Sequence, residues 1–285
     1  MTLPLISVVV TTKNEEKNIK NCLQSIQRQT YPAEFLETIV VDNQSSDCTK
    51  ELALGFTDKV FDVGPERSAQ RNFGIEQANG KYVLYLDADM DLSERVIEDC
   101  YEVVKHDPEM VGLYISEVVT GGSFFCKVRS FERRFYEGTV IDCARFLNKK
   151  VFMELGGFDL SMSGPEDWDF DKRLRDVGKV GLVYTPIFHN EAEFKLGKYL
   201  AKKSYYAKDF DTYISKWGWD DADIQKQFGF WYRFLWVFLE NGKWKKLVTH
   251  PFLVFGMYFL RVMVGIQFLR RKSLRINNDI LSPYA

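Results

Sequence analysis

Strand-like and helix-like patterns of apolar residues alternate along residues 1–115. Short, β-branched apolar runs predict buried strands, and these runs are Ile6–Thr12, Thr38–Asp42, Lys59–Val63 and Tyr82–Leu86. Between them apolar residues recur at helical spacing, which predicts helices after Asn14 as an N-cap, over Arg67–Asn79 with Gly80 as a C-cap, and over Glu94–Lys105. Repeated strand–helix units with short connections predict an α/β fold whose mostly parallel sheet is flanked by helices.

Polar residues gather where three of the predicted strands end. They are Thr11 to Glu15, Asp42-Asn43 and Asp87-Ala88-Asp89. In parallel sheets, ligands bind outside the carboxyl ends of the strands. Two carboxylates on alternate residues at one strand end can both reach a divalent cation, which completes its shell with water and phosphate oxygens. The pattern therefore indicates a metal and diphosphate site, with a simple polar turn after Leu86 as the alternative.

The pattern changes beyond residue 116. Glu166 and Asp167 follow Gly164-Pro165 and begin a predicted helix. The helix dipole stabilises carboxylates at this position whether or not they take part in chemistry, so the two residues have a structural as well as a functional interpretation. We expect Asp169 and Asp171, further along the same helix, to be solvated.

Composition adds one asymmetry to this picture. Residues 1–194 carry 22 Lys and Arg against 33 Asp and Glu, whereas residues 195–285 carry 16 against 7. An acidic first part suits metal binding, and a basic, aromatic tail suggests an anionic surface as its partner. The tail is too apolar for a surface that tracks phosphates, so we expect no nucleic-acid partner. The five cysteines have no metal-ligand or redox spacing and are expected to be free thiols.

One segment of this tail, Pro251–Leu269, has Arg261 as its only formal charge. A spanning helix needs about 20 apolar residues, so the segment is borderline. Basic residues flank it on both sides, and Trp231, Trp236 and Trp244 precede it. These features favour helices that lie in the headgroup region of an anionic membrane, with Arg261 reaching the headgroups. A packed helical cap and a true span are the alternatives.

In its motifs the chain resembles the inverting glycosyltransferases of family 2, a nucleotide-sugar group with the GT-A fold. The matching segments follow the family's order, cover roughly residues 5–195, and are Ser7–Glu15, Val40–Thr49, Gln70–Gly74, Asn79–Asp89, Gly156–Asp159 and Glu166-Asp167. The resemblance implies a Rossmann-like GT-A domain over residues 1–215. A basic, aromatic and helical region that associates with a membrane would follow over residues 216–285.

By this resemblance, a UDP or GDP sugar would be bound by residues at the strand ends and on the helix that begins at Arg67. They are Thr11, Asn14, Glu15, Asp42, Arg71, Asn72, Asp87 and Ala88. On the residues alone, Arg71 has an ordinary ion pair as its alternative role.

The resemblance also implies a bound Mn²⁺ or Mg²⁺. Asp89 would be its direct ligand, with Asp87 contacting the ribose or a metal-bound water. His189, after a strand predicted over Val180–Thr185, would complete the metal shell or touch the diphosphate. The metal would neutralise the departing nucleoside diphosphate. On the residues alone, a structural role for His189 is equally open.

For the transfer itself, the resemblance makes Asp167 the general base that deprotonates an acceptor hydroxyl, with Glu166 as its neighbour. A single displacement would invert the anomeric centre. The expected acceptor is a lipid-linked or cell-envelope glycan at the cytoplasmic face of the membrane.

Other functions fit less well. A polyprenyl-phosphate sugar synthase has an anionic acceptor that needs no strong base, so Glu166-Asp167 favour a hydroxyl acceptor. A sugar nucleotidyltransferase would have a glycine-rich loop after the first strand, which Thr11–Glu15 lacks. A non-catalytic membrane protein that binds nucleotide sugars is the alternative outside the enzymes, and it would be expected to have lost one of Asp87, Asp89 or Asp167.

Overall fold

The computed structural model of the chain describes residues 2–191 and 194–281, with residues 269–281 described as backbone only. The chain forms two compact units. The first contains residues 2–120, 136–161 and 166–191, and the second contains residues 121–135, 162–165 and 194–281. The units interleave along the chain, because the second takes two short segments from within the first. A domain boundary near residue 215 stays a prediction.

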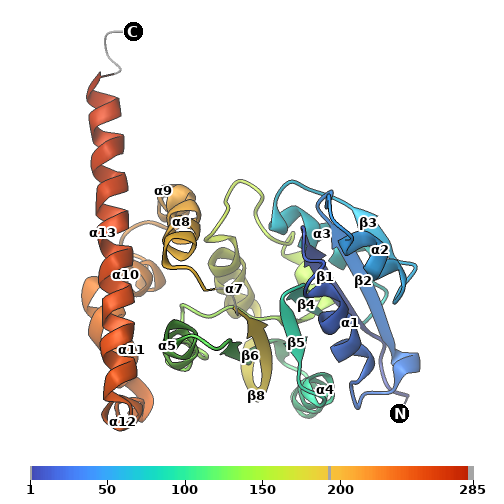
Figure 1. Cartoon of the computed structure of the whole chain (residues 1–285). Helices are drawn as coiled ribbons and strands as arrows, with labels where there is room; N and C mark the ends of the chain where they lie inside the picture. The colour runs from blue at the N-terminus through green and yellow to red at the C-terminus, as the bar shows by residue number, and fades with distance from the viewer. Residues whose placement is uncertain (1, 192–193, 282–285) are drawn as a thin grey trace. The chain divides into compact units, whose positions relative to one another are not determined.

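An eight-stranded sheet forms the centre of the first unit (Figure 1). Its strands are β1 (Ile6–Thr12), β2 (Leu36–Asp42), β3 (Val60–Asp62), β4 (Tyr82–Asp87), β5 (Met90–Leu92), β6 (Met110–Thr120), β7 (Phe146–Asn148) and β8 (Lys179–Asn190). They lie in the order β3-β2-β1-β4-β7-β6-β8-β5. β7 is antiparallel to β4 and β6, β5 is antiparallel to β8, and the other pairs are parallel. The predicted α/β class with a mostly parallel sheet is confirmed.

The register of the strands brings predicted site residues to one edge of this sheet. Thr11 lies opposite Asp87 of β4, and Thr12 lies opposite Asp42 of β2. The carboxyl ends of β1, β2 and β4 therefore form one polar rim. Met90 of β5 pairs with His189 of β8, so the residues that directly follow β4 also meet the end of β8.

Helices cover both faces of the sheet in the first unit (Figure 1). They are α1 (Ile19–Gln27), α2 (Thr49–Leu54), α3 (Arg67–Gln77), α4 (Val96–His106), α6 (Lys149–Glu154) and α7 (Glu166–Val177), with a 3₁₀ turn over Ala33–Phe35. In β1, Val8 and Val10 join the core that α1, α2 and α4 cover, whereas Val9 joins the core of α3, α6 and α7. Burial on both faces explains why these strands are continuous apolar runs in the sequence.

The predicted N-cap at Asn14 is wrong. α1 begins at Ile19, and Asn14 has φ 54°, a left-handed conformation that asparagine tolerates better than most residues. Its Oδ1 accepts a hydrogen bond from Ser46 N (2.8 Å). Asn14 therefore connects the loops after β1 and β2 instead of starting a helix.

The predicted C-cap at Gly80 is also wrong. α3 begins at Arg67 as expected but ends at Gln77. Gly80 lies against β1, where a Cβ atom would come within 2.6 Å of Ser7 N. Glycine is needed here because two backbones approach closely.

Near the start of β2, the buried carboxylate of Glu37 joins three segments of the first unit. It accepts hydrogen bonds from Ser7 Oγ, Lys59 Nζ, Asn79 N (2.8 Å) and Asn79 Nδ2 (2.7 Å). Burial by itself raises the pKa of Glu37, but these hydrogen bonds outweigh it and lower the pKa to about 2. A carboxyl group whose pKa is lower in the folded state stabilises the fold above its unfolded pKa. That stabilisation is lost as the pH falls through the folded pKa.

We expect Glu37→Gln to lower the free energy of unfolding at pH 7 by about 3 kcal/mol, because one pKa unit corresponds to about 1.36 kcal/mol. The difference from the wild type should close as the pH falls from 4.5 to 2. Urea unfolding at a series of pH values measures this, with Glu51→Gln on the exposed surface of α2 as the control. A deficit of equal size at pH 7 and pH 2 would contradict the role given to Glu37.

The second unit is built of helices. They are α5 (Phe124–Arg133), α8 (Leu196–Tyr206), α9 (Phe210–Trp217), α10 (Ala222–Phe228), α11 (Val237–Leu239), α12 (Trp244–Thr249) and α13 (Pro251–Leu281), with 3₁₀ turns over Ala207–Asp209 and Glu240–Gly242 and a π-helix over Tyr232–Trp236. α13 packs on α5 and α8. Gly256 allows close packing on α5, since a Cβ atom there would be 2.6 Å from Val128 Cγ2.

The expectation that Arg261 reaches lipid headgroups is wrong. Arg261 is buried within the second unit, where its Nη1 donates to Glu132 Oε1 of α5 (2.5 Å) and its Nη2 donates to Arg233 O. Its guanidinium also lies over the rings of Phe234 (5.2 Å) and Phe238 (4.9 Å). A charge on an apolar helix needs a partner, and Glu132 supplies one inside the protein.

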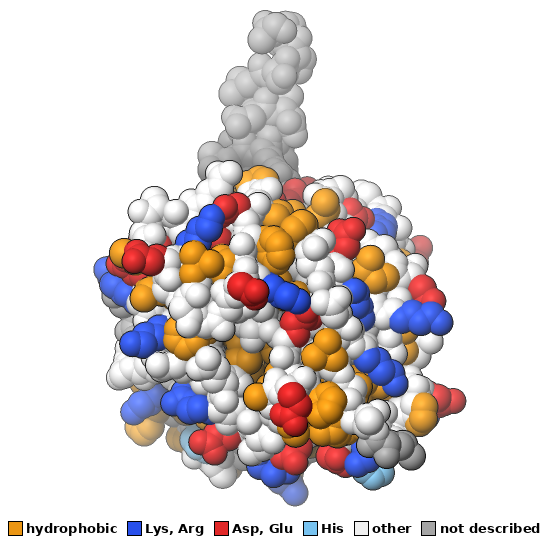
Figure 2. Space-filling view, turned by 90° about the vertical axis from the view of Figure 1, so that its right-hand side faces the viewer, with side chains coloured by type: hydrophobic (Ala, Val, Ile, Leu, Met, Phe, Trp, Pro, Cys, Tyr) orange, Lys and Arg blue, Asp and Glu red, His pale blue; other side chains and the backbone are white. Residues whose placement is uncertain are grey.

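The face of the molecule drawn in Figure 2 mixes acidic, basic and apolar side chains, with the two signs of charge interspersed. Exposed ion pairs of the first unit, such as Lys50 with Asp62, join side chains that are about half exposed. Pairs of this kind contribute little to stability, so the packed faces of the sheet and buried hydrogen bonds stabilise the first unit.

Candidate functional site

Two arginines of α3 hold Asp87 at the end of β4. Arg71 Nη2 donates to Asp87 Oδ1 (2.9 Å), and Arg67 Nη1 lies 3.4 Å from Asp87 Oδ2. Thr11 Oγ1 also donates to Asp87 Oδ1 (3.1 Å). The two arginines are four residues apart and project from the same face of α3. Both carboxylate oxygens of Asp87 therefore have protein partners.

Arg71 is buried, and its guanidinium lies over the rings of Tyr85 (4.8 Å) and Phe158 (5.8 Å). Burial alone would raise the pKa of Asp87, but the charges of Arg71, Arg67 and Arg145 outweigh it and hold that pKa well below the usual range. Asp87 in turn raises the pKa of Arg71, although burial opposes the rise. Asp87 and Arg71 are thus both charged at neutral pH.

Asp89 meets His189 beside this pair. His189 Nε2 lies 3.1 Å from Asp89 Oδ2, and His189 Nδ1 lies 2.8 Å from Glu117 Oε1 of β6. Burial lowers the pKa of His189, but the hydrogen bonds with the two carboxylates outweigh it and raise the pKa to about 9. Without a metal, His189 is therefore a cation that bridges two carboxylates at neutral pH.

One oxygen of Asp89 is available for a metal. Asp89 Oδ1 is buried and has no hydrogen-bond partner among the described residues. Such an oxygen is costly unless a cation or a donor binds it. Asp89 offers a carboxylate oxygen, which suits Mn²⁺ and Mg²⁺, His189 adds an imidazole nitrogen, and Asp87 lies next to them.

The protein donors alone do not enclose a metal. Within residues 2–191 and 194–281, no group of three or more His, Cys, Asp or Glu side chains is arranged to hold a metal ion. The donors present fit an ion that takes its other ligands from water and a diphosphate, as Mg²⁺ commonly does.

The two carboxylates at the start of α7 belong to the same cluster of charges. Glu166 is buried, and burial together with the charge of Asp167 raises its pKa against the opposing charges of Arg71 and Arg67. Asp167 is partly exposed. Because Arg71 interacts electrostatically with both Asp87 and Glu166, the structure brings the strand-end acids and the α7 carboxylates together around this arginine.

The expectation that Asp169 and Asp171 are solvated is wrong. Asp169 is buried and accepts a hydrogen bond from Arg173 Nε (2.9 Å). Asp171 is also buried and accepts from Arg175 Nε (2.9 Å) and Tyr114 OH (3.0 Å). An arginine one helical turn later neutralises each carboxylate, which allows α7 to pack on β6 and β8. This packing fixes the position of the carboxylates at the start of the helix.

The remaining residues expected to bind the nucleotide lie at the ends of β1, β2 and β4 or just after them, and they are Thr11, Asn14, Glu15, Asp42 and Ala88. Asp42 is buried and accepts hydrogen bonds from Ser45 N (2.7 Å) and Ser45 Oγ (2.5 Å). Glu15 Oε2 accepts from Asn18 Nδ2 (2.6 Å). These bonds shape the loops at the polar rim, and ligand contacts by the five residues stay predictions.

Asn72 has a structural task. Its Nδ2 donates to Phe158 O and its Oδ1 accepts from Phe158 N, both at 2.9 Å. A Cβ atom on Gly157, which has φ +70°, would come within 2.7 Å of Asn72 Oδ1. Asn72 thus binds the Gly156–Asp159 turn to α3 and places Phe158 beside Arg71. The contact predicted between Asn72 and a nucleotide stays untested.

Sequence reasoning missed three charged residues of this cluster: Arg67, Glu117 and Arg145. Glu117 carries a signal, because a lone carboxylate in the apolar run Met110–Thr120 is costly to bury without a partner. Arg67 carries another, since it lies one helical turn before Arg71. Arg145 Nη2 lies 3.4 Å from Glu117 Oε2. Because Arg145 follows a segment without clear periodicity, the sequence pattern gives no signal that it belongs to the site.

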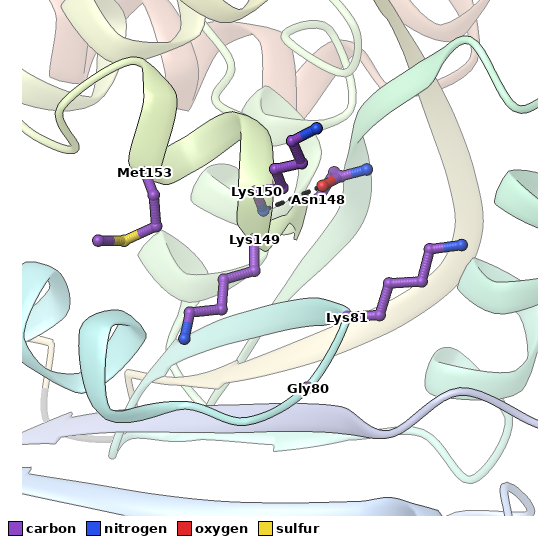
Figure 3. A pocket seen from close by; sticks show the side chains of 6 residues that line it. All are labelled: Gly80, Lys81, Asn148, Lys149, Lys150 and Met153. Atoms are coloured by element: carbon purple, nitrogen blue, oxygen red, sulfur yellow. Dashed lines mark hydrogen bonds between the residues drawn. The ribbon is translucent and has the colours of Figure 1, made fainter.

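A separate hollow lies at the opposite edge of the sheet, where β4 begins and β7 ends (Figure 3). It is lined by Gly80, Lys81, Asn148, Lys149, Lys150 and Met153. Lys149 Nζ there donates to Glu76 O (3.1 Å). Because ligands of parallel sheets bind at the carboxyl ends of the strands, we do not assign this hollow to the candidate site.

Solved structures share this fold. The mannosyltransferase PcManGT from Pyrobaculum calidifontis, in complex with GDP-Man and Mn²⁺, has a TM-score of 0.58 and 17% identity over 99% of this chain and 81% of that one. Residues 1–349 of Staphylococcus aureus TarS, in complex with UDP-GlcNAc, have a TM-score of 0.55 and 19% identity over 71% and 65% of the two chains. The predicted GT-A fold is confirmed.

Sequence comparison assigns the family. Glycosyltransferase AglE of Haloferax volcanii is 38% identical over 104 residues, which are 34% of this chain and 34% of that protein. The chain matches between 29% and 42% of the length of its first three curated relatives. The model of glycosyl transferase family 2 matches residues 7–160, more than half of the chain. The protein therefore belongs to glycosyl transferase family 2.

Proposed function

We propose that the protein transfers a sugar from a nucleoside-diphosphate sugar to a hydroxyl acceptor, with a bound Mn²⁺ or Mg²⁺ and with inversion of the anomeric centre. The observation that carries this proposal is the buried oxygen of Asp89, beside His189 at the polar rim, which no described residue hydrogen-bonds. Membership of family 2 and the neighbours in complex with GDP-Man and with UDP-GlcNAc support a nucleotide sugar as the donor.

The residues around the metal position divide into ligands and supporting cations. Asp89 and His189 would hold the ion, with Asp87 next to it. When bound, the ion neutralises charge on the departing diphosphate. The side chain of Arg67 is 37% exposed and can contact a diphosphate, whereas that of Arg71 is 4% exposed and fixes Asp87.

Asp167 is the general base of the proposed reaction. It is partly exposed, so an acceptor hydroxyl can reach it, and its Oδ1 accepts a hydrogen bond from Trp168 N (2.9 Å). Glu166 is buried, so an acceptor hydroxyl reaches it less readily than it reaches Asp167. A positioned base favours a hydroxyl acceptor over a polyprenyl phosphate. The related TarS is a poly(ribitol-phosphate) beta-N-acetylglucosaminyltransferase, and we propose a cell-envelope or lipid-linked glycan as the acceptor here.

The metal requirement is tested at Asp89. Asp89→Ala should abolish sugar transfer while the protein stays folded, because the carboxylate oxygen that would bind the ion is lost. Asp62→Asn, which changes an exposed carboxylate at the end of β3, should leave transfer unchanged. Release of UDP or GDP from the sugar donor measures transfer, and circular dichroism checks folding. Wild-type transfer that persists in EDTA would exclude the metal.

The base is tested by Asp167→Asn, which preserves volume but cannot accept a proton. Transfer should fall by about 10²–10⁴-fold with nucleotide binding largely kept. Asp176→Asn, an exposed residue at the other end of α7, is the matched control. Near-normal turnover of the Asp167 variant would move the base to another residue. Retention of the anomeric configuration, observed by NMR of the product, would reject the single displacement.

We also propose that the second unit attaches the protein to the cytoplasmic face of an anionic membrane. Large apolar side chains are exposed along one stripe of α13, including Phe252 (82% exposed) and Phe255 (75%). Among the described residues, one helix segment, Pro251–Phe268, is long and apolar enough to cross a membrane by length and composition. Because Arg261 is paired inside the protein, the exposed stripe can lie in the headgroup region while the opposite face stays packed. The five free cysteines suit a reducing compartment.

Flotation with liposomes tests this attachment. The full chain should float with anionic vesicles and detach at high salt, because surface Lys and Arg each contribute about 1 kcal/mol of attraction that salt screens. A variant with Phe252→Gln and Phe255→Gln should float less well. Tyr184→Gln removes an equally exposed aromatic ring from β8 and serves as the control. A full chain that stays in the soluble fraction would indicate a packed cap, and one that resists carbonate extraction would indicate a span.

A further inference from the structure

Glu117 is a carboxylate in the middle of the apolar strand β6, and its side chain is buried. Burial of a charge at such a position is unfavourable unless the group is paired and hydrogen-bonded. An apolar residue would pack there at lower cost. The contacts of Glu117 therefore have to account for its presence.

Each oxygen of Glu117 has a different partner. Oε1 lies 2.8 Å from His189 Nδ1, and Oε2 lies 3.4 Å from Arg145 Nη2. Arg145 is also buried, with its guanidinium over the ring of Tyr85 (5.6 Å). Arg145 thus supplies the countercharge of Glu117, and the first oxygen is left to hold the imidazole.

The pairing of β6 with β8 places the side chain of Glu117 beside His189. β6 and β8 are parallel neighbours in which Val119 lies opposite His189, and their register shifts between Ile115 and Glu117. Irregularities of this kind redirect side chains within a sheet. With Nδ1 held by Glu117, the other ring nitrogen, Nε2, lies on the side of Asp89 (3.1 Å to Oδ2). The orientation of the ring toward Asp89 therefore depends on Glu117.

We propose that Glu117 is a positioning residue, whose hydrogen bond to Nδ1 of His189 keeps Nε2 beside Asp89 for a divalent cation, with Arg145 as its countercharge. This inference rests on the proposed metal-dependent transfer and adds a residue to it that would not touch the ion or the substrate. Partners that orient a metal-binding histidine in this way commonly affect metal affinity by about 10–100-fold.

Two substitutions distinguish a positioning role of Glu117 from a purely electrostatic one. Glu117→Asp keeps the charge beside Arg145 but shortens the side chain and withdraws its oxygen from His189. Glu117→Gln keeps the length and an acceptor oxygen but loses the charge. Positioning predicts that Glu117→Asp weakens Mn²⁺ binding by about 10-fold or more and Glu117→Gln by less than about 3-fold. A purely electrostatic role predicts the reverse order.

Mn²⁺ binding is measured on the full chain by electron paramagnetic resonance of the free ion, with UDP or GDP present. Thermal unfolding checks that each variant is folded. Glu37→Asp shortens another buried strand carboxylate, on β2, and should keep wild-type Mn²⁺ affinity. Transfer by Glu117→Asp should recover at high Mn²⁺ concentration, since the metal affinity changes and the reacting groups do not.

The outcomes distinguish this inference from the function on which it rests. A folded Glu117→Asp variant with wild-type Mn²⁺ affinity overturns the inference and leaves the transferase proposal standing. If Glu117→Asp does not fold, a folded Glu117→Gln variant that loses 10-fold or more in affinity overturns it instead. A wild-type protein that binds no Mn²⁺ with either nucleotide overturns both the inference and the metal requirement.

Discussion

Two carboxylates can lie two residues apart at one partly buried strand end only if each has a cationic partner, because like charges at such a distance oppose each other's ionisation. Asp87 is neutralised by Arg71 and Arg67, which reach it from α3. Asp89 is paired with His189, which reaches it from β8. The fold of the first unit has to bring these cationic side chains from distant parts of the chain to one edge of the sheet.

The contact between Asp89 and His189 depends on β5, a strand of three residues. In the sheet, β7 and β6 lie between β4 and β8, so the end of β8 is not beside the end of β4 in strand order. The chain leaves β4 through Asp89 and enters β5 directly, and β5 pairs with β8 so that Met90 lies opposite His189. This short antiparallel pairing joins Asp89 to His189, and the charged network continues through Glu117 to Arg145.

The fold class and the strand ends are predictable from the sequence because β1, β2 and β4 are local, continuous apolar runs covered by amphipathic helices. Asp87, Asp89 and Asp167 are recognisable by motif. The short strands β5 and β7 have too few residues for a periodic signal, and the long strand β6 contains a charged residue. Tertiary partners determine the rest: the burial of Asp169 and Asp171 depends on Arg173, Arg175 and Tyr114, and Asn14 and Gly80 form contacts between segments instead of helix caps.

The ion pair of Arg261 with Glu132 has a consequence for how the chain is made. The two residues are 129 positions apart, so α5 leaves the ribosome long before α13 exists. At about 5–20 residues per second, roughly 6 to 26 seconds of synthesis separate them. During that interval Glu132 lacks the hydrogen bond and ion pair that Arg261 supplies in the folded chain. Closure of the second unit is therefore a late event of biosynthesis, and it is completed by the helix that carries the exposed aromatic stripe.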